Sequence, residues 1–359
     1  MNTTAKLALI GTAAIAGLFI TNRLYQPDAS TDPQGSLLLP ELVRKVETLE
    51  SVHIRQHDQQ THLARGEQGW TVVEKSHYPA DTDRLRKLLQ QLSDARKVER
   101  KTARAEHFPR LNLADPDATE GGGTALRLDF GGETITLILG KRARAGGTLL
   151  RMADETQSWR VKPAIQAVAD PMHWLDDTVV DLAPTLWQSL RVEPATGLGW
   201  TLARATVDER NFTLEPMPAG KTFKDEHISR SPFTALQMLH FTDVRPEQPD
   251  VDPAATLHFH GWYGDRLKVR VFENEDGNWF AFQFQPGPEP DSFTDKMKEK
   301  LPDAEGHDLS TLEQENLNAV LSGWWYRLPD YKASQLYRQR DDLLKDASPQ
   351  DEKRAETDP

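Results

Sequence analysis

The chain has 359 residues, of which 38% are apolar, and this is enough for about two domains with cores of their own. Its formal net charge is -12 and its sequence shows no basic stripe, so the composition argues against a nucleic-acid-binding surface. Cysteine is absent, which excludes disulfides, thiolate metal sites and a cysteine nucleophile.

The N-terminus carries an export or anchoring signal. Leu7 to Ile20 form an uncharged apolar run that follows Lys6. No small-x-small cleavage site follows this run, so an uncleaved transmembrane helix within residues 1–25 is favoured over a cleaved signal peptide or a buried soluble helix. Because Lys6 precedes the run, the positive-inside tendency predicts a single-pass inner-membrane protein with the bulk of the chain in the periplasm.

A linker is predicted over residues 26–47, because Gln26 to Ser36 is rich in Pro, Asp, Ser and Gly. Within this linker, Leu37 to Val43 can form a short helix or strand that docks on the folded body. The folded part of the chain is therefore expected to start after the tether.

The remaining chain uses one sequence design twice, and repetition of this kind reports architecture directly. Each copy has a short alternating strand, a Leu-Ala-Arg segment, an aromatic strand, an amphipathic helix, a hairpin and a tryptophan strand. The first copy is predicted over residues 48–184 and the second over 185–285. The corresponding segments are Val52–Arg55 and Leu190–Glu193, Leu63–Arg65 and Leu202–Arg204, Trp70–Val73 and Phe212–Leu214, Leu126–Leu139 and Leu257–Phe272, and the strands at Trp159 and Trp279.

The helix of the first copy follows a predicted turn, Tyr78-Pro-Ala-Asp81. Asp81 or Asp83 can cap its N-terminus. Another helix is predicted to begin in the segment from Pro163 to Leu175, and the helix of the second copy starts at Ser231. The apolar faces of the two repeat helices are Leu85, Leu88, Leu89 and Leu92 in the first copy, and Phe233, Leu236 and Leu239 in the second.

The strands of each copy are expected to pair with their sequence neighbours, since the hairpins turn at Gly131-Gly132 and at Gly264-Asp265. We therefore predict an α+β fold of two tandem homologous repeats. Each repeat is a mainly antiparallel sheet with helices packed on one face, and the N-terminal transmembrane helix precedes both.

A helical segment is predicted over residues 286–344, and a disordered acidic tail over residues 345–359. Ser310 and Glu313 have the spacing of a capping box, which indicates a helix start. The predicted helices are Asp291–Leu301, Ser310–Leu321 and Tyr331–Leu344.

Four motifs spread along the chain together suggest a family: Trp70 through Tyr78-Pro-Ala-Asp81, Leu139-Gly-Lys141 with Leu149-Leu-Arg151, His173-Trp-Leu-Asp-Asp177, and Trp325-Tyr-Arg-Leu-Pro-Asp-Tyr-Lys332. With them the chain resembles a bacterial family known only as a domain of unknown function. The resemblance implies a single-anchor protein with tandem α/β repeats outside the cytoplasm. It also implies an auxiliary subunit of a gliding-motility-type ABC transporter, because members are often encoded beside such transporters. No catalytic residue is carried over.

Two polar clusters have the residue types of a reactive site. His258 and His260 lie on one face of a strand at a spacing seen in metal sites, but no third ligand follows, so a solvated or hydrogen-bonded strand face is favoured. His173 with Asp176 and Asp177 could serve acid/base chemistry or glycan hydrolysis. Adjacent residues point apart on an extended chain and Asp is common in turns, so a structural role is favoured there too.

The candidate interaction surface consists of aromatic and basic side chains. Gly140-Lys141-Arg142 fails the spacing of a phosphate loop, because no Ser or Thr follows the lysine, but Lys141 and Arg142 could touch an acidic glycan or a partner. Trp324 and Trp325 cannot both face inward on a strand, so one of them is expected at a contact surface, and Trp262 is a further candidate.

We predict no catalytic residue, no cofactor and no metal. The expected function is that of a non-catalytic, membrane-anchored envelope protein that acts as a scaffold or auxiliary subunit, with an ABC-type permease as its partner and no nucleic acid. The alternatives are a periplasmic glycan- or peptide-binding module and, less favoured, an envelope hydrolase.

Overall fold

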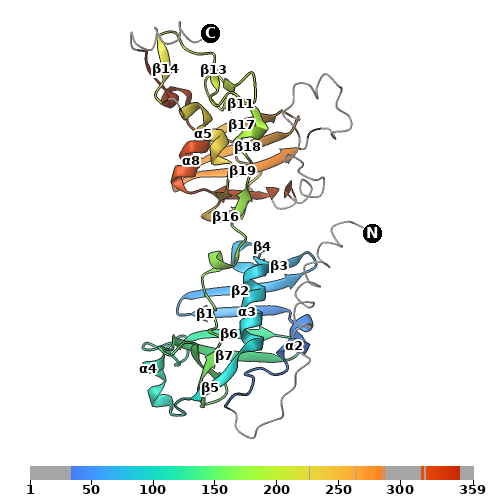
Figure 1. The fold of residues 1–359 in the computed structure, drawn as a ribbon, viewed down its shortest axis with the longest axis vertical. Coiled ribbons are helices and arrows are strands. Elements are labelled where there is room, and N and C mark those ends of the chain that lie inside the picture. Colours follow the sequence, from blue (N-terminus) through green and yellow to red (C-terminus); the bar gives the residue numbers. More distant parts are fainter. Residues whose placement is uncertain are drawn as a thin grey trace. The chain divides into compact units, whose positions relative to one another are not determined.

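The structure is a computed structural model that describes residues 34–225, 227–262, 264–285, 287, 317–318 and 321–347 (Figure 1). The chain divides into two compact units, Met1–Asp176 and Asp177–Pro359. Each unit is built on one large sheet, and every pair of neighbouring strands that the structure describes is antiparallel.

The sheet of the first unit has nine strands in the order β4-β3-β2-β1-β6-β7-β8-β9-β5. Alternation of apolar and polar residues buries one face of its strands, as in β1, where Val52 and Ile54 are fully buried. The strands are β1 (Ser51–Gln56), β2 (Gln59–Gly66), β3 (Gly69–Val72), β4 (Tyr78–Pro79), β5 (Arg96–Arg100), β6 (Thr124–Asp129), β7 (Thr134–Arg142), β8 (Thr148–Met152) and β9 (Ser158–Lys162).

One helix of ordinary length, α3 (Thr82–Asp94), runs across the strands of this sheet in Figure 1. The Asp81 side chain caps it by accepting from the backbone N–H groups of Asp83 and Arg84, as the sequence predicted. Its predicted stripe is buried, so α3 supplies a large part of the core. The remaining helical turns of this unit are α2 (Leu42–Lys45), η1 (Val46–Thr48), η2 (Val73–Lys75), η3 (Ala105–His107), α4 (Phe108–Leu111) and η4 (Pro171–Trp174).

The sheet of the second unit has eight strands in the order β13-β12-β11-β17-β18-β19-β20-β16, and two small sheets pair β10 with β15 and β14 with β21. The strands are β10 (Thr178–Val180), β11 (Trp187–Pro194), β12 (Trp200–Ala203), β13 (Thr213–Glu215), β14 (Lys221–Phe223), β15 (Leu239–His240), β16 (Asp243–Pro246), β17 (Ala255–Gly261), β18 (Arg266–Asn274), β19 (Gly277–Gln285), β20 (Trp324–Arg327) and β21 (Leu344–Asp346). The helical turns are η5 (Pro184–Leu186), η6 (Ile228–Arg230), α5 (Ser231–Ala235), α8 (Asp330–Leu336) and η8 (Arg340–Leu343).

Aromatic side chains build the core of the second unit. Phe233 of α5 stacks on Phe212 with ring centroids 3.8 Å apart, and it meets Phe259 of β17 edge-on at 5.6 Å. Trp187 of β11 contacts the same Phe259 at 5.5 Å. All four rings are buried, so α5 is fixed to the sheet by aromatic packing although it is only five residues long.

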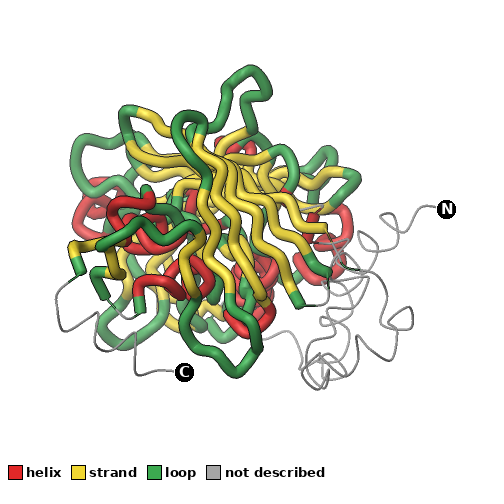
Figure 2. Tube along the Cα trace, turned by 90° about the horizontal axis from the view of Figure 1, so that it is seen from above, coloured by secondary structure: helices red, strands yellow, loops and turns green. Residues whose placement is uncertain are grey.

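The predicted α+β class is wrong, because the described chain is mostly antiparallel sheet with few helices. Figure 2, in which strands are yellow, shows how strongly sheet dominates. The segment from Pro163 to Leu175 forms only the short η4, and the predicted turn at Tyr78–Pro79 is strand β4. Short apolar segments of this kind are decided by the backbone partners they find, and Ala80 pairs with Leu175 here.

The C-terminal helix predicted from Tyr331 to Leu344 is also shorter than expected. Helix α8 ends at Leu336, and Leu344–Asp346 pairs with β14, so this strand includes the first residues of the predicted tail. Part of the predicted linker is folded as well, because Leu38, Leu39 and Leu42 are buried on the first unit. The hairpins at Gly131-Gly132 and at Gly264-Asp265 are confirmed.

Several predicted elements lie outside the described residues: the transmembrane helix within residues 1–25, the helix Asp291–Leu301, nearly all of Ser310–Leu321, and the end of the tail. Within the described part of the chain, no helix is long and apolar enough to span a membrane.

Candidate interaction surfaces of the second unit

The second unit carries a row of basic side chains on one sheet face. Side chains alternate along β11, β17 and β18, so the apolar residues enter the core while Arg191, His258, His260, Arg266 and Lys268 share the opposite face. Strand register aligns them, because Arg191 lies opposite His258 and His258 opposite Lys268, while His260 lies opposite Arg266. We call these five residues the basic sheet face.

Only part of this charge is neutralised within the described chain. The Glu193 carboxylate lies 2.9 Å from Arg191 Nε and 3.4 Å from His258 Nε2. No described carboxylate forms an ion pair with Arg266 or Lys268. A hollow of about 510 Å³ lies along this face, and the uncharged polar side chains that line it are Gln283, Gln285 and Asn318.

Burial lowers the pKa of His260 below its ordinary value of 6.5. Electrostatic repulsion from Arg266, and to a smaller extent from His258 and Arg191, lowers this pKa further. These surroundings therefore favour the neutral form of the imidazole. Arg191, Arg266 and Lys268 surround the two histidines, and the nearby Glu193 carboxylate is ion-paired with Arg191, which disfavours a divalent metal there. In the described chain, no group of three or more His, Asp or Glu side chains could hold a metal ion.

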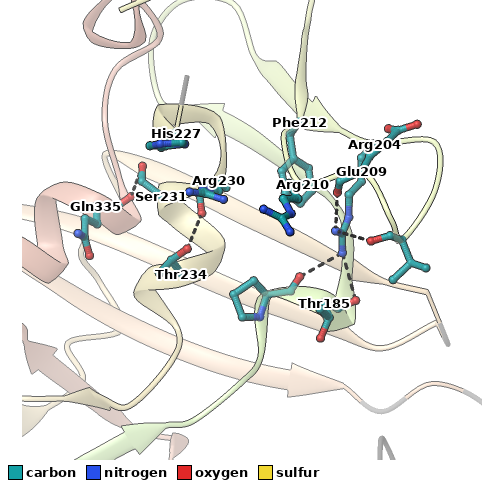
Figure 3. A pocket seen from close by; sticks show the side chains of 12 residues that line it. Thr185, Arg204, Glu209, Arg210, Phe212, His227, Arg230, Ser231, Thr234 and Gln335 are labelled. Atoms are coloured by element: carbon teal, nitrogen blue, oxygen red, sulfur yellow. Dashed lines mark hydrogen bonds between the residues drawn. The ribbon is translucent and has the colours of Figure 1, made fainter. Parts of the chain in front are cut away.

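A second concavity of about 580 Å³ lies between the segment that joins β12 to β13 and the start of α5 (Figure 3). Three arginines line it, Arg204, Arg210 and Arg230, and we call it the arginine pocket. Its other lining residues are Pro184, Thr185, Val207, Glu209, Phe212, His227, Ser231, Thr234 and Gln335.

Arg204 lines this pocket, and its guanidinium is held by groups of the protein itself. Its side chain is 7% exposed, and the guanidinium carbon lies 4.9 Å from the Phe212 ring and 5.6 Å from the Trp262 ring. Burial lowers its pKa, which the charge of Glu209 partly opposes. The guanidinium donates to five backbone carbonyl oxygens, those of Pro184, Thr185, Trp187, Val207 and Glu209.

The predicted tryptophan surface is only partly exposed. Trp325 is buried, with its ring stacked on Phe272 at 4.1 Å, so it belongs to the core and not to a contact surface. Its neighbour Trp324 faces the other way on β20 and is half-buried, as expected for adjacent residues of a strand. Trp262 is half-buried, and its indole N–H has no hydrogen-bond partner in the described chain.

Lys141 and Arg142 are exposed at the end of β7 in the first unit. The Lys141 ammonium donates to the Arg110 carbonyl at 3.0 Å. The backbone of this region requires glycine at two positions, Gly140 and Gly147. A Cβ at Gly140 would meet the backbone of Leu111, and Gly147 has a φ of +87° where the hairpin presses on the Val161 carbonyl.

The His173, Asp176 and Asp177 cluster is not assembled as acid/base chemistry requires. The His173 ring packs edge-on against Trp174 at 5.2 Å, and burial together with Arg84 lowers its pKa. The carboxylates that act on His173 are those of Asp170 and Asp81. Asp177 instead lies 3.5 Å from His240 Nδ1 in the second unit.

The family motifs place their polar residues in structural roles. Arg151 is buried, and it donates to the Leu113 carbonyl at 2.9 Å and to the Asp115 carboxylate at 2.8 Å. The Trp174 indole donates to the Val168 carbonyl at 2.7 Å. Lys332 of α8 donates to the carbonyls of Ala235 and Gln237, at the C-terminal end of α5.

The fold defines a class of protein with two mainly β units, each built on one antiparallel sheet. The polar residues of its family motifs form hydrogen bonds that stabilise this fold. The chain belongs to the family described as Domain of unknown function (DUF4340), whose profile matches residues 70–258. Membership of a domain-of-unknown-function family, predicted from the motifs, is thereby confirmed. Searches of curated proteins and of solved structures each found no significant match.

Proposed function

We propose that this protein is a non-catalytic scaffold or auxiliary subunit of the bacterial envelope. In this proposal the N-terminal apolar segment holds it in the inner membrane, the two units lie in the periplasm, and an ABC-type permease is the partner. The observation that carries the proposal is the basic sheet face, because a row of basic side chains that includes Arg191, Arg266 and Lys268 is suited to docking an acidic surface even on an acidic protein.

Docking on this face depends on Arg266 and Lys268. They are the two residues of the basic sheet face with a permanent positive charge and no carboxylate partner in the described chain. An acidic loop of the permease would approach side chains held in register by paired strands, so little ordering of this face is needed. Exposed charges attract over about 8 Å at physiological ionic strength, which speeds encounter and makes the complex sensitive to salt.

The tandem-repeat organisation is part of this proposal. Two observations support it. In both large sheets the first strand, β1 or β11, lies beside a later hairpin, and a strand that comes after the helix, β5 or β16, closes the far edge. Arg65 and Arg204, from the two Leu-Ala-Arg segments, both donate to carbonyl oxygens just before the first sheet strand, those of Glu47 and of Pro184 and Thr185.

The test is a pull-down of the tagged protein from membranes of its native host in mild detergent, with partners identified by mass spectrometry. We expect an ABC permease and its ATPase with the wild type. The double variant Arg266→Glu/Lys268→Glu should recover roughly tenfold less of both, because each reversal adds repulsion to lost attraction.

The matched control is Lys224→Glu/Lys345→Glu, which changes net charge equally at two exposed positions away from this face. It should recover the permease as the wild type does. Equal recovery with both double variants would reject the basic sheet face as the docking surface. Recovery of no membrane partner at all would contradict the auxiliary-subunit role and favour the periplasmic binding module.

A further inference from the structure

We propose that the arginine pocket binds the phosphate group of a small organic phosphate ester. This inference is independent of the proposed docking role, because the pocket and the basic sheet face share no residue. It rests on the charge gathered in the pocket, on the groups left free to bind, and on the size and chemistry of its walls.

The pocket concentrates positive charge in a protein whose formal net charge is -12. Arg204, Arg210 and Arg230 line it, and among the residues that the structure describes Glu209 is the one acidic side chain in its lining. The Glu209 carboxylate accepts the backbone N–H of Ala205 at 2.9 Å, and its influence falls on Arg204. Like charges repel in a confined space, so a bound anion would relieve an electrostatic cost that the empty pocket carries.

Arg210 and Arg230 are the two guanidinium groups available for a ligand. Neither forms an ion pair with a carboxylate in the described chain, whereas the donors of Arg204 are occupied by backbone carbonyls. In Figure 3 the two side chains reach toward one another from the β12–β13 segment and from the residue before α5. Arg204 therefore fixes the pocket wall and adds positive potential, while Arg210 and Arg230 supply the contacts.

The number of free guanidinium groups favours phosphate over carboxylate. A carboxylate carries one negative charge and matches one guanidinium fork, whereas a phosphate ester carries close to two charges and three acceptor oxygens. Two forks from separate elements therefore match a phosphate better. The Gln335 side chain and the His227 ring also line the site and can supply further donors.

The remaining walls indicate that the ligand is larger than phosphate itself. The cavity measures about 580 Å³, within the range of small-molecule sites. Phe212 is buried beneath it, and Val207 and Pro184 add apolar lining. An organic group bonded to the phosphate can cover these side chains, so an ester should bind more tightly than inorganic phosphate.

The experiment is calorimetric titration of the full-length protein in detergent with glycerol 3-phosphate, inorganic phosphate and glycerol. We expect glycerol 3-phosphate to bind, inorganic phosphate to bind more weakly, and glycerol not to bind. The double variant Arg210→Gln/Arg230→Gln should weaken binding of glycerol 3-phosphate at least about tenfold. Arg210→Lys/Arg230→Lys, which keeps the charge but loses the forks, should fall between it and the wild type.

Lys224→Gln/Lys345→Gln is the matched control for loss of two positive charges, and it should bind as the wild type does. The proposal is overturned if neither phosphate compound binds, or if this control loses as much affinity as Arg210→Gln/Arg230→Gln. It is also overturned if inorganic phosphate binds as tightly as the ester. Arg266→Glu/Lys268→Glu should retain glycerol 3-phosphate binding, which separates this result from the docking test.

Discussion

At the scale of single residues, the Arg204 guanidinium shows how a buried cation can be held without a carboxylate. Its donors meet five carbonyl oxygens and its faces meet two aromatic rings. Arg204→Met keeps most of the side-chain volume but leaves those carbonyls without their donor. We expect it to lower the free energy of unfolding by about 2–4 kcal/mol, measured by urea denaturation followed through tryptophan fluorescence.

Arg210→Met is the control for that measurement, because Arg210 is exposed beside the same pocket. Its cost should stay within about 0.5 kcal/mol. If Arg204→Met were no more destabilising than Arg210→Met, the buried hydrogen bonds of Arg204 would not contribute to the free energy of unfolding.

A second residue-scale prediction concerns His53, whose ring stacks on that of His62 with centroids 3.8 Å apart. Burial lowers the pKa of His53 below 6.5, and the charges that act on it are those of His62, Asp129, Arg127 and Glu74. The unfolded chain therefore binds a proton at a higher pH than the folded chain does. Folding stability should consequently fall as pH decreases through the region below about 6.5.

The measurement is the free energy of unfolding between about pH 7 and about pH 5, for the wild type and for His53→Gln. The variant should lose less stability over this interval, because it removes one group that binds a proton more weakly in the folded chain than in the unfolded chain. His107→Gln, at a histidine outside the stacked pair, should retain the wild-type slope. An unchanged slope in His53→Gln would contradict the assignment.

At the scale of elements, α3 begins where the local sequence predicts a helix N-terminus. Asp81 caps the helix through two backbone N–H groups, and its carboxylate also lies 2.9 Å from Arg84 Nε. Asp81→Ala should lower the free energy of unfolding by about 1 kcal/mol, whereas Asp81→Asn should cost less because its amide oxygen still accepts. Thermal or urea unfolding would measure both.

Asp83→Ala is the companion variant for this helix. Asp83 pairs with Arg86 at 2.5 Å, but its side chain is 80% exposed, so little stability should be lost. A larger loss for Asp83→Ala than for Asp81→Ala would identify Asp83 as the effective cap and contradict the observed geometry.

At the scale of the whole molecule, the division into two compact units predicts that each can fold alone. Each unit has a large sheet and a buried aromatic and aliphatic core of its own. We expect fragments 34–176 and 177–347 to unfold cooperatively when expressed separately, as judged by circular dichroism and chemical-shift dispersion. Absence of a cooperative transition in either fragment would show that the unit depends on the rest of the chain.

Sequence reasoning succeeded where the deciding interactions are local. The leucine stripe of α3, the Asp81 cap and the two glycine hairpins follow from side-chain spacing and turn chemistry. It failed for the class of the fold, because short apolar segments such as Pro163 to Leu175 join sheets or form single turns according to distant partners. It also could not decide which of Trp324 and Trp325 faces the core, since the burial of adjacent tryptophans depends on which face of β20 meets the core.

The sequence by itself determined the two glycine hairpins, the absence of thiol chemistry, the N-terminal apolar segment and the family. Only the tertiary structure decided where charge accumulates. Arg191 is far along the chain from Lys268, and pairing of β11 with β17 and of β17 with β18 brings them to one face. The arginine pocket likewise joins Arg210 to Arg230 through the packing of Phe212 on Phe233. A charge count cannot report either cluster, because charge density depends on long-range pairing that the local sequence does not specify.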